Sequence, residues 1–339
     1  MKRALSLLLA LLLFPAAVFA PDAGSNEVIT GQWTFEHGTK GPTGGIDRAD
    51  GVRVPADATS GYAPGCIFTL RNATLGQCPT WLNQGTQTSS KFRPFGPVIG
   101  YGFAYAGDKL FVSGTAGLVC GYPVADSADI GFCGHSTSDD NDQIVSVKAS
   151  TVGITCTNGA DPLSAHSAYY AGLRSGCVPQ YDIFAAGTKT LAGGNAAEAI
   201  TITGALATDI PLVNYGATDD TDTISKAIMT ANTLTVTMSA DPSTTHSIHY
   251  AILRPRGSFK PTHYVAYAGT STTVGGAAAE AITITGAKVG DIPIVRYAVT
   301  NDTDSILKSV VTANTLTVTM SADPSTAHAL SYALLRAYP

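Results

Sequence analysis

The feature that most constrains the fold of this chain is an internal repeat of about 80 residues. Residues 186–254 match residues 268–336 without gaps, and roughly two thirds of the positions are identical. A more divergent third copy precedes them, since residues 160–174 parallel residues 240–254. Repeats of this length are whole structural units that pack against their neighbours. The sequence therefore predicts three tandem units that fill the chain from about residue 101 onward.

The pattern within each repeat predicts β-structure. In the second copy, apolar residues alternate with Thr or small polar residues over 199–203, 210–215 and 233–238. A period of two is typical of half-buried strands, and β-branched residues suit them. The stretch 222–229 fits a short helix or another strand, and we favour a strand. Short strands between Gly, Pro and Asp turns predict an all-β protein with three small sandwich or jelly-roll-like repeats.

These patterns divide the chain into five parts. The residues before the repeats are rich in Gly, Pro and Thr, so we expect an extended attachment segment that carries some strands. Joints that contain Pro and Gly separate the repeats. The expected parts are a hydrophobic leader at 1–20, the extended N-terminal segment at 21–100, a divergent cysteine-containing β-repeat 1 at 101–177, β-repeat 2 at 182–257 and β-repeat 3 at 264–339.

The leader is open to more than one interpretation. Lys2 and Arg3 precede a mostly apolar run that ends at Ala20, as in a secretory signal. Pro21 is a poor residue to follow a cleavage site, and 4–20 is at the short limit for a membrane span. The run is a cleaved signal, a retained anchor or buried assembly helix, or the result of a gene start placed too early.

Composition and motifs argue against nucleic-acid binding and against common enzyme classes. The chain has 20 Lys plus Arg and 25 Asp plus Glu, a formal net charge of -5, and DNA binding needs a basic face. The signatures G-x-S-x-G, H-E-x-x-H, G-x-x-x-x-G-K-[ST] and G-x-G-x-x-G do not occur in the sequence. We therefore expect no enzyme, no catalytic residue, no cofactor and no nucleic-acid partner.

Acidic residues and histidines recur at equivalent places in the three copies. Carboxylates two residues apart in a turn can hold Ca²⁺, but we favour a solvated turn in which Asp and Asn bond their own backbone, since no EF-hand Glu follows. His166, His246 and His328 are expected to open strands after hairpin turns rather than to share a metal. We assign no metal site, and the calcium candidates are Asp140, Asp142, Asp220, Asp222, Asp302 and Asp304.

All six cysteines lie before residue 178. An even count beside an export-like leader favours disulfides, whereas a cytoplasmic protein would keep six reduced thiols. Alignment with the second copy places Cys120 and Cys133 in neighbouring strands that a short turn joins, within disulfide range. We predict a Cys120–Cys133 disulfide and a local Cys66–Cys78 disulfide.

The N-terminal segment carries a resemblance to bacteriophage proteins. Ile29-Thr-Gly-Gln-Trp-Thr-Phe35 resembles strand openings of phage fibre proteins, and Gly65-Cys-Ile-Phe68 followed by 81–92 resembles a pattern of virion surface proteins. The repeats are similar to a domain of phage head-decoration and fibre proteins. The resemblance implies a fibre or capsid decoration subunit on the virion surface, which binds other virion proteins and host surface glycans. The alternative is a secreted bacterial adhesin or extracellular filament subunit, which the leader and the cysteines favour.

The size of the repeats predicts an assembly. A β-unit of about 80 residues has a thin core and exposed strand edges. Three joined copies can cover these edges within one chain around a pseudo-threefold axis, or between chains as a true trimer. We expect a homotrimer, with contacts through Tyr250, Leu253, Tyr332 and Leu335 of the last strands.

Overall fold

The computed structural model shows an all-β protein, as predicted. It describes residues 39–40, 46–71, 73, 77–95, 100–111, 117–120, 126–137, 144–151, 153–158, 166–217, 223–240, 244–257, 259–273, 277–299, 305–322 and 328–338. Every regular element in these ranges is a strand. The chain divides into two compact units, the first formed by Met1–Asn72 and Thr80–Phe92 and the second by Ala73–Pro79 and Arg93–Pro339.

The first unit is built on a sheet whose strands follow in chain order. The strands are β1 (Thr39–Lys40), β2 (Ile46–Gly51), β3 (Tyr62–Leu70), β4 (Thr80–Asn83) and β5 (Phe92–Pro94). Strands β2 and β3 run parallel, while β3 and β4 run antiparallel. Aromatic side chains form the buried side, where the ring of Phe92 lies 5.0 Å from Tyr62 and 5.8 Å from Phe68 between centroids. This region, expected to be extended, therefore has a packed core of its own.

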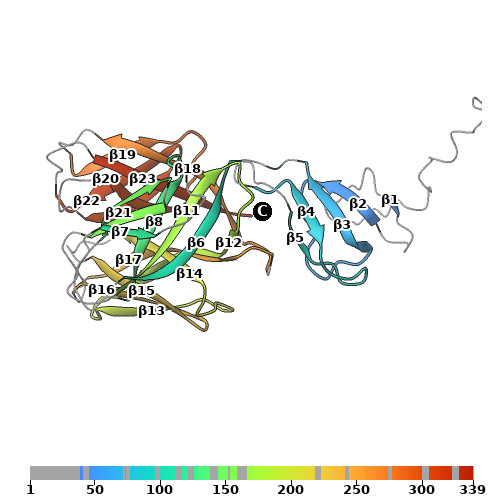
Figure 1. Cartoon of the computed structure of the whole chain (residues 1–339), viewed down its shortest axis with the longest axis horizontal. Helices are drawn as coiled ribbons and strands as arrows, with labels where there is room; N and C mark the ends of the chain where they lie inside the picture. The colour runs from blue at the N-terminus through green and yellow to red at the C-terminus, as the bar shows by residue number, and fades with distance from the viewer. Residues whose placement is uncertain are drawn as a thin grey trace, which may run out of the picture. The chain divides into compact units, whose positions relative to one another are not determined.

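The second unit contains the three repeats, and each repeat is a sandwich of two three-stranded antiparallel sheets. The inner sheets are β6 (Tyr101–Phe111), β11 (His166–Ser175) and β8 (Ile130–Thr137) in repeat 1, β12 (Tyr181–Leu191), β17 (His246–Pro255) and β14 (Ile210–Ala217) in repeat 2, and β18 (His263–Thr273), β23 (His328–Ala337) and β20 (Ile292–Val299) in repeat 3. The outer sheets are β7 (Gly117–Cys120), β10 (Gly153–Asn158) and β9 (Ile144–Ser150), then β13 (Ala197–Thr201), β16 (Thr233–Met238) and β15 (Ile224–Thr230), then β19 (Ala279–Thr283), β22 (Thr315–Met320) and β21 (Ile306–Thr312). In Figure 1 the outer sheet of repeat 2 lies at the bottom and that of repeat 3 toward the top. The stretch that fitted a helix or a strand is the strand β15, as favoured.

Side-chain alternation explains why these segments form two-layered units. In β16 and β22, Leu, Val and Met are buried at every second position and Thr lies between them. A strand with this pattern buries one face and leaves the other to solvent. Two such sheets packed face to face bury both apolar faces.

The three repeats close into a ring within one chain. The three inner sheets join through strand β12, which pairs with β6 at Tyr181–Phe103 and with β18 at Ile183–His263. Around this junction, β8 of repeat 1 packs against β15 of repeat 2, and β14 of repeat 2 packs against β21 of repeat 3. Strand β20 of repeat 3 returns to β9 of repeat 1. The same contact occurs three times in a cycle, so the second unit has a pseudo-threefold axis.

The apolar core follows this symmetry. Repeats 1 and 3 each have a separate core. One larger cluster combines the core of repeat 2 with buried residues of repeats 1 and 3. Equivalent leucines from the last strand of each repeat, Leu173, Leu253 and Leu335, are fully buried in that cluster. The prediction that Leu253 and Leu335 contact another chain is therefore wrong, because they already pack inside this one. Tyr250 and Tyr332 are half-buried against the same cores.

Candidate functional site

The structure does not bring the recurring histidines together. His166, His246 and His328 open β11, β17 and β23, as expected, and each is buried in its own repeat. Each packs against a ring of that repeat, His166 against Phe111 and His246 against Tyr215. The calcium candidates Asp140, Asp142, Asp220, Asp222, Asp302 and Asp304 lie outside the described residues.

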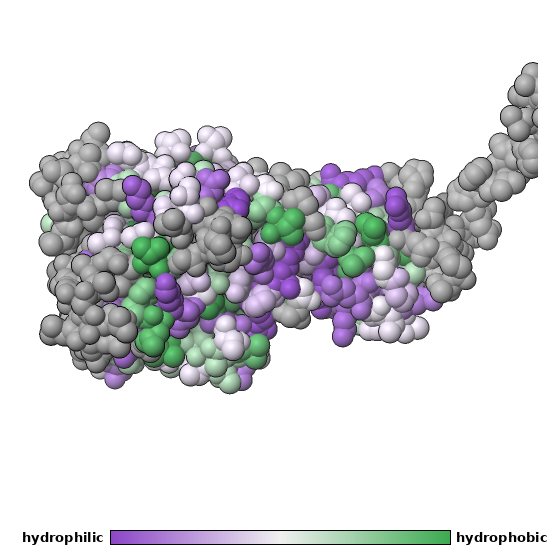
Figure 2. Space-filling model, viewed as in Figure 1, coloured by the Kyte–Doolittle hydropathy of each residue, from purple (hydrophilic) through white to green (hydrophobic). Residues whose placement is uncertain are grey.

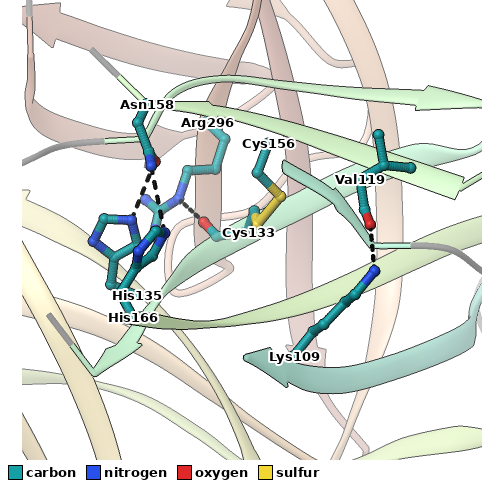
Figure 3. Close-up of a disulfide and its surroundings, with 8 residues drawn as sticks. All are labelled: Lys109, Val119, Cys133, His135, Cys156, Asn158, His166 and Arg296. Carbon is teal, nitrogen blue, oxygen red and sulfur yellow. Dashed lines mark hydrogen bonds between the residues drawn. A yellow bond between two sulfur atoms is a disulfide. The ribbon is translucent and has the colours of Figure 1, made fainter. Parts of the chain in front are cut away.

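An arginine occupies the pseudo-threefold axis. Cys133, Val213 and Val295 are equivalent residues of the three repeats, and the guanidinium of Arg296 donates hydrogen bonds to all three of their carbonyl oxygens. The bond from Nε to Cys133 is 3.0 Å long and is drawn in Figure 3. A planar cation with five donors suits three carbonyls that converge on one point. Arg296 thus ties the three inner sheets to one another.

The position of Arg296 shows why only one repeat supplies this cation. The equivalent residues are Gly134 in repeat 1 and Asn214 in repeat 2. A Cβ atom added at Gly134 would lie 2.0 Å from the hydroxyl oxygen of buried Tyr169. Asn214 instead donates a 2.9 Å hydrogen bond to Ser309 of repeat 3. Of the three equivalent positions, repeat 1 has no side chain and repeat 2 has an amide that binds repeat 3, so the cation comes from repeat 3.

Each repeat also carries a buried ion pair at the same place. In each pair the arginine donates from Nε and Nη2 to the two carboxylate oxygens, at distances of 2.7–2.8 Å. The carboxylate precedes an inner strand and the arginine stands near the end of the adjacent strand, so the pair joins the two. Between 0% and 2% of each Asp side chain is exposed. The pairs are Asp129–Arg174, Asp209–Arg254 and Asp291–Arg336.

These carboxylates were not identified from the sequence. Each one also accepts a backbone N–H from the residue three positions earlier, as Asp209 does from Leu206 at 2.8 Å. For Asp129, burial raises the pKa, but the hydrogen bonds from Arg174 and from the backbone of Asp126 outweigh it and lower the pKa overall. The available signal was the constant separation of 45 residues between the Asp and the Arg in all three copies.

The disulfide in repeat 1 is not the one predicted. Cys133 of β8 is bonded to Cys156 of β10, and Cys120 is a buried free thiol. The prediction treated the strands of Cys120 and Cys133 as a hairpin. Strand β7 in fact pairs with β10 in the outer sheet, while β8 belongs to the inner sheet. The disulfide therefore links the two layers of the sandwich (Figure 3).

The predicted Cys66–Cys78 disulfide is also wrong, because these two cysteines are not bonded to each other. Cys66 lies on β3 within the first unit, whereas Cys78 belongs to the segment Ala73–Pro79 of the second unit. The thiol of Cys78 lies 3.6 Å from the carbonyl oxygen of Phe95 and accepts a 3.4 Å hydrogen bond from Arg256. Proximity in sequence therefore did not place these two cysteines in one core.

Polar residues accompany the cysteines in the core of repeat 1. His135 lies 3.2 Å from the amide oxygen of Asn158, and the amide nitrogen of Asn158 lies 3.5 Å from His166 (Figure 3). The equivalents of His135 and Asn158 in repeat 2 are Tyr215 and Met238. Repeat 1 has thus exchanged several apolar core positions for residues with donor atoms.

A second buried polar group lies beside Cys78. Asp182 and Arg256 form an ion pair with a 3.7 Å separation, and only 12% and 10% of their side chains are exposed. Burial raises the pKa of Asp182 to about 6, even though the charge of Arg256 lowers it. Tyr338 is buried beside them, and its pKa is raised by burial and by the charge of Asp182.

Metal-ligating side chains gather at one place in the described residues. There the sulfur atoms of Cys120, Cys133 and Cys156 all lie within 4.8 Å of one another. No helix in the described ranges has the length and hydropathy to cross a membrane. No protein-family model, no curated protein and no solved structure matches this chain, so its function has to be inferred from its own geometry.

Proposed function

We propose that this chain is a structural protein of the bacteriophage virion surface, either a fibre subunit or a capsid decoration subunit. The observation that carries the proposal is the closure of three tandem repeats around a pseudo-threefold axis. Such a body presents three similar sandwiches to its surroundings from one chain. The residues before the repeats then attach it to the particle, and the function is display and stabilisation rather than chemistry.

The internal bonding supports a role as a rigid scaffold. Arg296 links the three inner sheets at the axis, and a buried ion pair fastens each repeat. Hydrogen bonds to a charged group are stronger than neutral ones, and burial shields them from salt. A particle surface exposed to varied media needs stability of this kind.

The outer sheets supply a polar surface suited to weak contacts with host glycans. In β16 the threonines Thr233, Thr235 and Thr237 alternate with buried apolar residues and are half-exposed. On the face drawn in Figure 2, green apolar residues form small separate patches among white and purple ones. Hydroxyl groups both donate and accept hydrogen bonds, as sugar hydroxyls require.

A secreted adhesin or extracellular filament subunit is the second candidate. The Cys133–Cys156 disulfide favours it, because structural disulfides form and persist in oxidising compartments. Under either proposal the leader at 1–20, which lies outside the described residues, would decide the route of the chain.

Mass spectrometry of purified particles separates the two candidates. Particles are banded on a density gradient, and the chain is quantified there and in the particle-free supernatant of the same culture. A virion protein stays with the particles at a fixed ratio to the major capsid protein, and a gold-labelled antibody against the second unit decorates them. A chain found only in the supernatant, with no label on particles, contradicts the virion proposal and supports the secreted one.

The homotrimer is a separate proposal with its own test. Its physical reason was the need to cover strand edges, and closure within one chain now covers several of them. Light scattering at micromolar concentration should give three times the mass of one chain if copies associate. A monodisperse monomer would refute the homotrimer and leave the pseudo-threefold body as the complete assembly.

A further inference from the structure

Three cysteines converge in the core of repeat 1, although a disulfide needs only two. The sulfur atoms of Cys120, Cys133 and Cys156 lie mutually within 4.8 Å, and all three residues are at most 1% exposed. Two of them form the disulfide, and the third lies beside it with a free thiol. Burial raises the pKa of Cys120 to about 12, so the unbound thiol is protonated and a poor nucleophile.

The other repeats show that packing does not require sulfur at these places. The positions of Cys120, Cys133 and Cys156 are occupied by Ile200, Val213 and Val236 in repeat 2, and all three of those are buried. Repeat 3 has Ile282, Val295 and Val318 there, buried likewise. An aliphatic core therefore suffices for this sandwich, and repeat 1 is the copy in which all three positions carry a metal-binding atom.

We propose that reduction of the Cys133–Cys156 disulfide turns this core into a three-thiolate site for a soft monovalent metal ion, Cu(I). Soft thiolate ligands select such ions. Three thiolates around one ion at about 2.3 Å, the length of a zinc–thiolate bond, stand about 4.0 Å apart. The sulfur of Cys120 already lies within 4.8 Å of the other two, and reduction releases the sulfurs of Cys133 and Cys156 to move apart from their bonded separation. Structural zinc sites have four ligands, and in the described residues no fourth side chain of His, Cys, Asp or Glu joins the group.

Two cations near the cluster partly offset the cost of burying a negatively charged metal–thiolate group. The positive charge of Lys109 lowers the pKa of Cys120 in part, against the effect of burial. Lys109 donates a 2.7 Å hydrogen bond to the carbonyl oxygen of Val119, the residue before Cys120. The guanidinium of Arg296 bonds the carbonyl of Cys133 from the side of the axis. Figure 3 shows Lys109 and Arg296 on the two sides of the disulfide. Asp108 opposes this effect at Cys120.

The chemistry balances in two steps. An external thiol reductant gives two electrons and two protons to the disulfide, which yields the thiols of Cys133 and Cys156 and oxidises the reductant to its own disulfide. Cu(I) then binds the three sulfurs and displaces their three protons, since a bound ion deprotonates its thiol ligands. The oxidised chain has no such site because two of the three sulfurs are bonded to each other.

The test is anaerobic titration of the reduced full chain with Cu(I) held by a competing bicinchoninate chelator. We expect one equivalent of tightly bound Cu(I) per reduced chain, none per oxidised chain, and an X-ray absorption spectrum with three sulfur neighbours. Cys120→Val should weaken binding at least tenfold while its Cys133–Cys156 disulfide still forms in the oxidised protein. Cys177→Ser, which changes a half-buried thiol outside the cluster, should leave binding unchanged.

Circular dichroism on the same samples covers the case in which reduction unfolds repeat 1. In that case, adding Cu(I) should restore the β-structure spectrum in the reduced wild-type chain, but it should not restore it in reduced Cys120→Val. Equal binding by wild type and Cys120→Val, absence of binding by the reduced chain, or retention of Zn(II) in preference to Cu(I) would overturn the assignment.

Discussion

The three equivalent ion pairs allow one substitution to be made at three depths of burial. Changing the Asp of each pair to Asn keeps the shape of the side chain and removes its charge, so the arginine loses its counter-ion. The partner arginines differ in exposure, at 12% for Arg254, 20% for Arg336 and 30% for Arg174. The less an arginine is exposed to water, the more the free energy of unfolding should fall when its charge is left unpaired.

The expected losses follow from that order. Removing one partner of a buried ion pair costs about 3–5 kcal/mol, because it leaves an uncompensated charge. Asp209→Asn should fall in this range, since Arg254 also lies 3.8 Å over the ring of Phe184 and cannot turn to water freely. Asp129→Asn should cost only about 1–3 kcal/mol, close to the value for an unsatisfied buried hydrogen bond. Asp291→Asn should lie between the two.

Urea unfolding followed by circular dichroism gives the free energy of unfolding of each variant, and calorimetry shows whether the second unit still unfolds in one transition. The first unit offers a matched control, because the Asp50–Arg71 pair there is 26% and 38% exposed. Asp50→Asn should cost no more than about 1 kcal/mol. Equal losses at the three sites, or the largest loss at Asp129, would refute the argument from burial.

Three further changes test other parts of the structure. The double variant Cys133→Val and Cys156→Val introduces the residues that repeat 2 has at these places. It should lower the free energy of unfolding by about 3 kcal/mol, because the disulfide closes a loop with a separation of 23 residues. An unchanged thermal midpoint would contradict this. Because its pKa is raised to about 6, Asp182 holds a proton in the folded chain between about pH 4 and 6, whereas the unfolded chain has lost that proton. The free energy of unfolding should therefore fall by about 3 kcal/mol as pH rises through that window. Urea unfolding of Asp182→Asn should show a flatter pH profile, and a profile identical to that of the wild type would disprove this assignment. Arg296→Met removes three hydrogen bonds that join the repeats at the axis, so the thermal midpoint should fall by several degrees, at roughly 2–4 °C for each kcal/mol lost.

Local features of the sequence were sufficient to predict the β-architecture. Alternation of apolar residues with threonine marks strands such as β16, since the period of a pleated strand is two whatever lies around it. The gapless match between 186–254 and 268–336 required two copies of one unit, because identical patterns fold alike. His246 opens the strand β17 for the same local reason.

Partners across the sandwich were decided only by the tertiary structure. Cys133 bonds Cys156 because β8 and β10 face each other from different sheets, whereas the sequence suggested a hairpin with the strand of Cys120. Asp209 and Arg254 lie 45 residues apart and meet only once β14 pairs with β17. Arg296 can donate hydrogen bonds to its three carbonyl oxygens only when all three repeats have closed into a ring. Strand identity depends on the nearest few residues, but these contacts depend on where whole sheets pack, which no local pattern encodes.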